Sequence, residues 1–135
     1  MQSNLSSYSS SYGRLELHVC FKVKYCHPIF RISLIADRCR QIFFQVAERY
    51  GIVIKEIGFS KDHVHLIIQL NPSISLTQAA KLLKGTSGKK LLEEFHYLKR
   101  RYFWGSGLWS PAIYFDSLGR EPEKMKNYVR NQNLS

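Results

Sequence analysis

Two histidines stand two residues apart in segment 62–70, which reads Asp-His-Val-His-Leu-Ile-Ile-Gln-Leu. Side chains alternate between the two faces of a β-strand, so His63 and His65 are predicted to share one face. Their Cα atoms would lie about 6.5 to 7 Å apart, a spacing that lets both imidazoles reach one divalent ion. Taken alone, a His-x-His pair favours surface or hydrogen-bonded histidines, so a metal site needs a second feature in its support.

That second feature is a pair four residues apart, Tyr128 and Gln132, in a stretch predicted to be helical, so both side chains lie on one helix face. The pair would offer a phenol and an amide carbonyl to the site of the histidines. A phenol of pKa about 10 attacks a phosphodiester poorly unless the phosphate is oriented and neutralised, which Mg²⁺ or Mn²⁺ can do. Two imidazoles and an amide oxygen suit Mn²⁺ better, although Mg²⁺ is the more available ion. Without these neighbours, Tyr128 would be taken for one packing tyrosine among eight.

Composition favours a nucleic-acid partner. The 135 residues hold 20 Lys and Arg against 10 Asp and Glu, which gives a formal net charge of +10. Aromatic residues make up 13% of the chain. The combination suits single-stranded nucleic acid, whose bases stack on aromatic rings while Lys and Arg bind the phosphates. The charge alone would also fit a merely soluble basic protein.

Several classes of protein are disfavoured. No segment has the roughly 18 apolar residues of a membrane span and no signal-peptide pattern opens the chain, which predicts a cytoplasmic protein without a membrane partner. Cys20, Cys26 and Cys39 contain no Cys-x-x-Cys pair and are predicted to be reduced thiols rather than a zinc knuckle or a disulfide framework. A two-histidine phosphoesterase would need His-x-Ser/Thr repeats, which the five histidines do not provide. A zinc hydrolase would need a nearby acidic general base.

The elements that would position the site follow from hydrophobic periodicity. In chain order we expect a strand over 14–25, a helix over 32–50, a strand over 52–59, the histidine strand, a helix over 75–100, a strand over 112–117 and a helix over 121–133. Residues 1–13 are rich in Ser and are predicted to be a disordered leader, which leaves 14–135 as one domain. This order predicts an α+β, ferredoxin-like split β-α-β fold, with an antiparallel sheet, helices on one face and an added C-terminal helix that carries the tyrosine.

Two of these elements carry further predictions. In 14–25 the inward row runs from Leu15 to Tyr25. The outer row, which includes Cys20, could be ordinary solvent-exposed surface, but its His18, Lys22 and Lys24 also suit contact with a nucleic-acid backbone. The helix over 75–100 has Ser75 as its predicted N-cap and is predicted to be interrupted at 85–88, where two glycines flank Thr-Ser. This basic segment is not a P-loop, because two residues rather than four separate its glycines, but its backbone and lysines could bind phosphates.

Several motifs in the same order resemble the single-tyrosine HUH transposases of the smallest prokaryotic insertion sequences, the IS200/IS605-like transposases. The motifs that carry the resemblance are Asp-His-Val-His-Leu, Leu-Lys-Gly-Thr-Ser at 83–87, Trp-Gly-Ser-Gly-Leu-Trp at 104–109, Tyr-Phe at 114–115 with Gly119, and Tyr128 with Gln132. They extend over about residues 15–132. Gly88 departs from the pattern, since a second small hydroxyl residue is expected after Ser87.

The resemblance implies a homodimer that binds subterminal DNA hairpins and cuts and rejoins single-stranded DNA. It implies His63, His65 and Gln132 as ligands of a divalent metal, and Tyr128 as a nucleophile that forms a 5′-phosphotyrosine, in its own or its partner's site. The residues expected to contact DNA are Lys22, Lys24, Lys84, Thr86, Ser87, Lys89 and Lys90. The alternative is a catalytically inactive module of the same fold that binds single-stranded nucleic acid.

Overall fold

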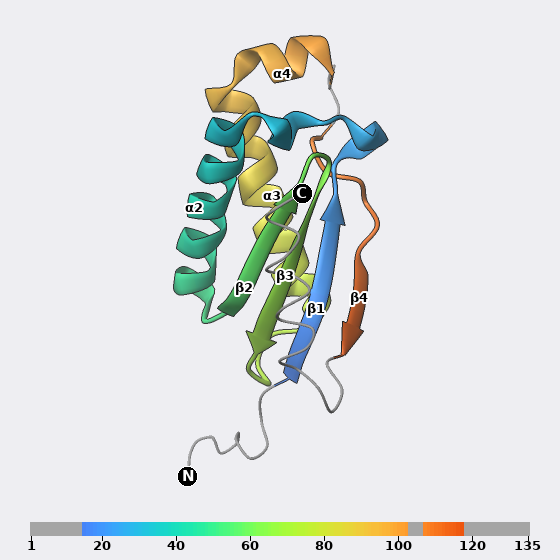
Figure 1. Ribbon diagram of the computed structural model, residues 1–135. Helices are drawn as coiled ribbons and strands as arrows, with labels where there is room; N and C mark the ends of the chain where they lie inside the picture. Colours follow the sequence, from blue (N-terminus) through green and yellow to red (C-terminus); the bar gives the residue numbers. More distant parts are fainter. Residues whose placement is uncertain (1–14, 103–106, 118–135) are drawn as a thin grey trace.

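The computed structural model describes residues 15–102 and 107–117 (Figure 1). Several predictions therefore lie outside the described residues. They are the leader over 1–13, the first half of the Trp-Gly-Ser-Gly-Leu-Trp turn, Gly119, and the C-terminal helix with Tyr128 and Gln132.

The described chain forms a four-stranded antiparallel sheet with helices on one face, as Figure 1 shows. The strands are β1 (Leu15–Lys22), β2 (Val53–Ser60), β3 (His63–Leu70) and β4 (Tyr114–Ser117), in the sheet order β2-β3-β1-β4. The helices are α2 (Ser33–Tyr50), α3 (Leu76–Glu94) and α4 (His96–Arg101), with short 3-10 turns η1 (Lys24–Cys26) and η2 (Ile29–Arg31). The predicted α+β, ferredoxin-like fold is confirmed for this part of the chain.

The hydrophobic core fills the space between the sheet and the helices α2 and α3. Alternate residues of β3 such as Val64 and Leu66 are fully buried in it, together with Phe43 of α2 and Leu83 of α3. Because successive residues of a strand point to opposite faces, His63 and His65 lie on the face away from these helices. The core thus fixes β3 from one side and leaves the histidines on the other.

The helix α2 begins and ends close to the predicted bounds. Its last residue is Tyr50, and the following Gly51 has a φ of 71°, in the left-handed region that glycine adopts without a steric cost. The N–H of Gly51 donates to the carbonyl of Ala47, which closes the last turn. The chain then enters β2, and the two residues Lys61 and Asp62 connect β2 to β3 as the predicted hairpin.

The predicted interruption of the second helix is wrong, because α3 runs without a break from Leu76 to Glu94. Glycines lower helix propensity, but packing overrides it here. The indole of Trp109 lies against the helix at Gly88, where an added Cβ would be 3.4 Å from Cδ1 of the ring. Its Nε1–H donates to Oγ of Ser87 at 2.9 Å, and both side chains are buried. The predicted N-cap is confirmed, since Ser75 accepts from the backbone N–H of Gln78.

The first strand is shorter than predicted, so Tyr25 does not continue its inward row. Regular pairing ends at Lys22, and Tyr25 lies in η1 with a φ of 60° and 75% of its surface exposed. Hydrogen bonds to distant segments stabilise the turn. The N–H of Lys24 donates to the carbonyl of Leu108, and the N–H of Val23 donates to the carbonyl of Asp62. Leu15, at the other end of the predicted row, is also exposed.

Removing the hydroxyl of Ser87 is expected to destabilise the fold. The substitution Ser87→Ala leaves the buried indole N–H of Trp109 without its acceptor, which costs about 1 to 3 kcal/mol. Urea unfolding measures this loss, and Thr86→Ala at the half-buried neighbouring position is the matched control. An unchanged unfolding midpoint in Ser87→Ala would mean that the hydrogen bond adds nothing to stability.

Candidate metal centre

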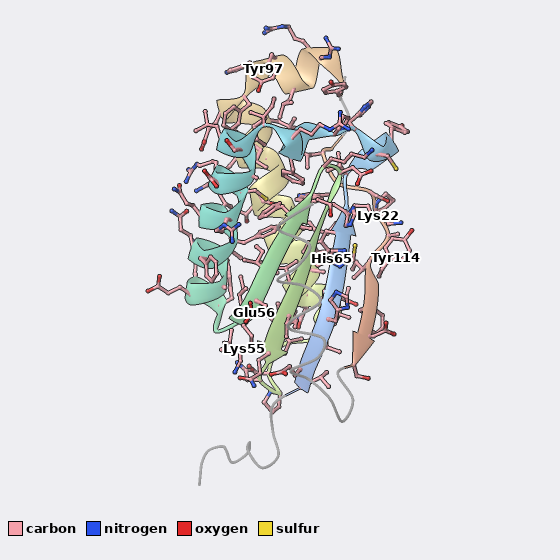
Figure 2. All side chains as sticks on the ribbon, in the orientation of Figure 1. Lys22, Lys55, Glu56, His65, Tyr97 and Tyr114 are labelled. Atoms are coloured by element: carbon pink, nitrogen blue, oxygen red, sulfur yellow. The ribbon has the colours of Figure 1, made fainter. Side chains whose placement is uncertain are left out.

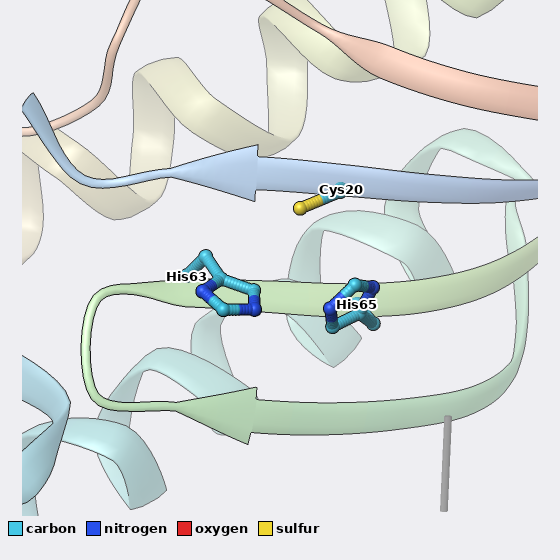
Figure 3. A group of neighbouring side chains, drawn as sticks. All are labelled: Cys20, His63 and His65. Atoms are coloured by element: carbon cyan, nitrogen blue, oxygen red, sulfur yellow. The ribbon is translucent and has the colours of Figure 1, made fainter. Parts of the chain in front are cut away.

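The two histidines lie side by side at the start of β3, as predicted (Figure 3). Their ring centroids are 4.7 Å apart, His63 is half-buried and His65 is only 8% exposed. β3 is hydrogen-bonded to β2 on one side and to β1 on the other. The backbone under both rings is therefore held by hydrogen bonds from two neighbouring strands.

Each imidazole is oriented by a hydrogen bond at Nδ1. Nδ1–H of His63 donates to Oδ1 of Asp62 at 2.8 Å. Nδ1 of His65 lies 3.0 Å from Nε2 of His18 on the neighbouring strand. When the Nδ1 atom of a histidine holds the proton of such a bond, Nε2 carries the lone pair and is the atom that can bind a metal. His63 thus has the outer hydrogen bond of a ligating histidine, and His65 has it in the tautomer in which its own Nδ1 donates to His18.

The surroundings of His65 favour its neutral form. The pKa of His65 is lowered to about 4, mainly by burial, and the neighbouring His63, His18 and Lys22 contribute to this shift in the same direction. Burial also lowers the pKa of His18, although the carboxylate of Asp116 opposes this shift. Only a neutral imidazole has a lone pair for a metal, so at neutral pH His65 is ready to act as a ligand.

Cys20 joins the histidines from the neighbouring strand. It lies opposite His65 in the pairing of β1 with β3. One ligand atom from each of Cys20, His63 and His65 lies within 4.8 Å of the others. Burial raises the pKa of the Cys20 thiol, an effect that Lys22 opposes and Asp62 reinforces.

Sequence reasoning missed Asp62, His18 and Cys20 as parts of the site. It placed His18 and Cys20 on the outer face of their strand, which is correct, but it had no register between β1 and β3. The signal that could have found Asp62 was its position directly before His63, at the end of the hairpin turn. Tyr128 and Gln132 lie outside the described residues, so their approach to the histidines stays a prediction.

The predicted lysine contacts fall on two sides of the sheet. Lys22 is exposed on the histidine side, opposite His63 in the strand pairing, with its Nζ 4.6 Å from the centre of the Tyr114 ring (Figure 2). Lys24 follows in η1 and is half-buried. Lys22 therefore lies beside the histidine pair, where a bound phosphate would gain from its charge.

The remaining predicted contacts belong to α3, in the layer behind the sheet. Nζ of Lys84 donates to the carbonyls of Ser110 and Ala112, at 2.7 and 3.2 Å, and burial lowers its pKa. Lys84 therefore binds the backbone of the segment before β4. Ser87 is fully buried, so the predicted direct contact of Ser87 with DNA is corrected by the structure. The other predicted DNA contacts on α3 are at least partly exposed, namely Thr86, Lys89 and Lys90.

A basic pocket that the sequence did not reveal borders the histidines. Its volume is about 590 Å³, and His63 forms part of its wall. Three cationic residues and two aromatic rings line it, namely Arg31, Arg40, Lys61, Phe30 and Phe59. Because Phe30 and Phe59 are buried in the core, the cations are the part of this pocket that could bind the phosphates of a nucleic acid.

Among the helices that the structure describes, none combines the length and the hydropathy of a membrane span.

Comparison with solved structures supports the fold. A crystal structure of a Deinococcus radiodurans R1 protein, described as a candidate transposase, superposes with a TM-score of 0.75 at 25% identity and covers 98% of both chains. A REP-associated tyrosine transposase bound to a REP hairpin superposes with a TM-score of 0.64 at 11% identity, over 89% of this chain and 67% of that one. The second likeness concerns the fold alone.

Comparison of sequences identifies the family. The ISDra2 transposase TnpA of Deinococcus radiodurans is 27% identical over 120 residues, which cover 88% of this chain and 84% of the relative. The transposase for insertion sequence element IS200 of Salmonella typhimurium is 27% identical over 118 residues, 85% of this chain and 74% of the relative. The family model described as "Transposase IS200 like" matches residues 11–132, so the chain belongs to the IS200-like transposase family.

Proposed function

We propose that this transposase cleaves and rejoins single-stranded DNA at the ends of an insertion sequence. Tyr128 is the nucleophile, and His63, His65 and Gln132 hold the divalent ion, Mg²⁺ or Mn²⁺. The observation that carries the proposal is the histidine pair itself, because both Nδ1 atoms have hydrogen-bond partners and the two rings each bring a nitrogen into one group of close potential ligands.

The chemistry conserves the energy of the phosphodiester bond. The Tyr128 oxygen attacks the phosphorus, a tyrosyl O–P bond forms, and the bond to the 3′-oxygen of the preceding nucleotide breaks. The phenolic proton is lost and the leaving oxygen takes up a proton, giving a 5′-phosphotyrosine and a free 3′-hydroxyl. A bound divalent ion would neutralise the phosphate charge. A 3′-hydroxyl can then reverse the step, so that rejoining needs no ATP.

Charge near the histidines supports a path for the DNA strand. Lys22 lies on one side of the pair, and the basic pocket with Arg31, Arg40 and Lys61 lies on the other side of His63. A strand whose scissile phosphate reaches the histidines could place its neighbouring phosphates or bases on these groups. The REP hairpin held by the structural relative makes a hairpin end the substrate to test first.

A labelled oligonucleotide carrying an element end, folded as a hairpin with a single-stranded flank, tests the proposal. Incubation of the full chain with Mn²⁺ is expected to give a covalent protein–DNA band in a denaturing gel, and EDTA should abolish it. A catalytically inactive binding module would shift the DNA in a native gel and give no covalent band under either condition. That second outcome would replace the proposal by the binding-module alternative.

Neutralising the cations beside the histidines should weaken DNA binding and reduce its dependence on salt. For Lys22→Ala combined with Lys24→Ala, the slope of log K against log salt is expected to fall by about 0.7 to 0.9 for each phosphate that the variant no longer neutralises. Fluorescence anisotropy at several salt concentrations measures it. A double variant of two exposed lysines in other elements, Lys55→Ala in β2 with Lys81→Ala in α3, is matched in charge. Equal slopes in the two double variants would contradict a specific role for the first pair.

A homodimer is expected in solution, because moving an element requires handling two DNA ends and each chain offers one candidate nucleophile. The helix that carries Tyr128 could then serve its own site or its partner's, with Gly119 as the joint. Light scattering at micromolar concentration is expected to give twice the mass of the 15.8 kDa chain. A monomer that still cleaves DNA would exclude the dimer requirement.

A further inference from the structure

The metal site contains a donor that the proposed chemistry does not use. The thiol of Cys20 comes from β1, and the two imidazoles come from β3 (Figure 3). Among residues 15–102 and 107–117, these three side chains are the single group of three potential ligands close enough to hold one ion. The half-buried thiol therefore stands where a ligand would stand.

The separation of the three atoms is compatible with a four-coordinate ion. Tetrahedral zinc, with Zn–N of about 2.0 Å and Zn–S of about 2.3 Å, holds its ligand atoms about 3.3 to 3.6 Å apart. The present atoms lie within 4.8 Å of one another, so closure needs a movement of about 1.5 Å at most. Side-chain rotation can supply that movement while the paired strands stay in place.

The donor set decides which ions would use the thiol. Thiolate sulfur is a soft ligand that Zn²⁺ and related ions bind strongly, whereas Mg²⁺ prefers oxygen and gains little from sulfur. A thiolate also brings a negative charge to a site whose imidazoles are neutral ligands, and it offsets half the charge of a divalent ion. Two histidines alone would make a weak zinc site, and the added cysteine makes it a three-ligand site.

We propose that Cys20 is a third protein ligand at this site and that it makes the chain bind a thiophilic divalent ion such as Zn²⁺ more tightly than Mg²⁺ or Mn²⁺. The inference rests on the proposed function only in sharing His63 and His65 as ligands. Zinc in this site would compete with the ion that supports cleavage, so the thiol makes the enzyme sensitive to zinc.

Cobalt titration of the full, reduced chain without DNA tests the proposal. Co²⁺ bound to a thiolate gives an intense sulfur-to-cobalt charge-transfer band in the near ultraviolet. The band is expected in the wild-type chain and in Cys26→Ser, whose exposed thiol lies outside the cluster, and it should be absent in Cys20→Ser. Zinc affinity, measured by competition with a chromogenic chelator, should fall at least about 10-fold in Cys20→Ser. Removing a residue that only hydrogen-bonds to a metal ligand already costs about 10-fold or more in affinity, and removing a ligand should cost no less.

A charge-transfer band that persists in Cys20→Ser, or that disappears in Cys26→Ser, would overturn the proposal. Cadmium-113 NMR of the wild-type chain gives a second answer that needs no variant, because the shift of the bound ion moves far downfield with each sulfur ligand. A shift typical of nitrogen and oxygen ligands alone would also overturn it. These measurements contain no DNA, so their failure would leave the covalent adduct untouched, and a missing adduct would leave the cobalt band untouched.

Discussion

Tyr128→Phe is expected to abolish the covalent protein–DNA band while leaving DNA binding nearly unchanged. The substitution removes only the hydroxyl that would attack the phosphate. Loss of a nucleophile typically costs on the order of 10⁴-fold or more in rate, which is below detection in a gel assay. Quantifying the band with labelled hairpin DNA and Mn²⁺, alongside anisotropy for binding, separates the two effects.

Tyr97→Phe is the matched control for this experiment. Tyr97 is exposed on α4 and lies outside the histidine cluster, so its hydroxyl should be dispensable. If the two variants form adduct at the same rate, the nucleophile is another residue. If Tyr128→Phe loses binding and adduct together, the expectation that its hydroxyl is dispensable for DNA binding is wrong.

The second large effect concerns the histidines. His63→Ala or His65→Ala is expected to remove metal-dependent cleavage with the tyrosine intact, because neutralisation of the phosphate contributes several kcal/mol, a loss of roughly 10² to 10⁴-fold in rate. Initial rates of adduct formation over a range of Mn²⁺ concentrations measure this. Gln132→Ala should be impaired less, since water can replace a neutral ligand.

The outer hydrogen bond of His63 gives a graded test of the same site. Asp62→Ala removes the acceptor of its Nδ1–H and is expected to weaken metal affinity by about 10 to 100-fold, so that more Mn²⁺ restores the rate. Asp37→Ala, which removes an exposed carboxylate of α2, is the control. If Asp62→Ala needs no more Mn²⁺ than the control, the carboxylate does not orient a metal ligand.

The histidine pair was predictable from the sequence because a single strand defines it. The spacing of His63 and His65 within a β-branched run placed both rings on one face without knowledge of the rest of the fold. Cys20 and His18 join them only through the register of β1 against β3, in which Cys20 lies opposite His65. Such long-range pairing has no signal in a single sequence.

The second helix shows where local rules failed. Two glycines within four residues predicted a break, yet the indole of Trp109 packs against the backbone there and donates to Ser87. The partner is 22 residues away, so no propensity within the segment could reveal it. Tertiary packing also turned Ser87 from a predicted DNA contact into a buried acceptor.

Peptide mapping of the trapped adduct by mass spectrometry tests most directly that the chain acts through a phosphotyrosine. After nuclease and protease digestion, the nucleotide remnant is expected on the peptide that contains Tyr128, linked through its 5′-phosphate. A remnant on Tyr114, which lies near Lys22 beside the histidine pair, or on any other tyrosine would contradict the assignment.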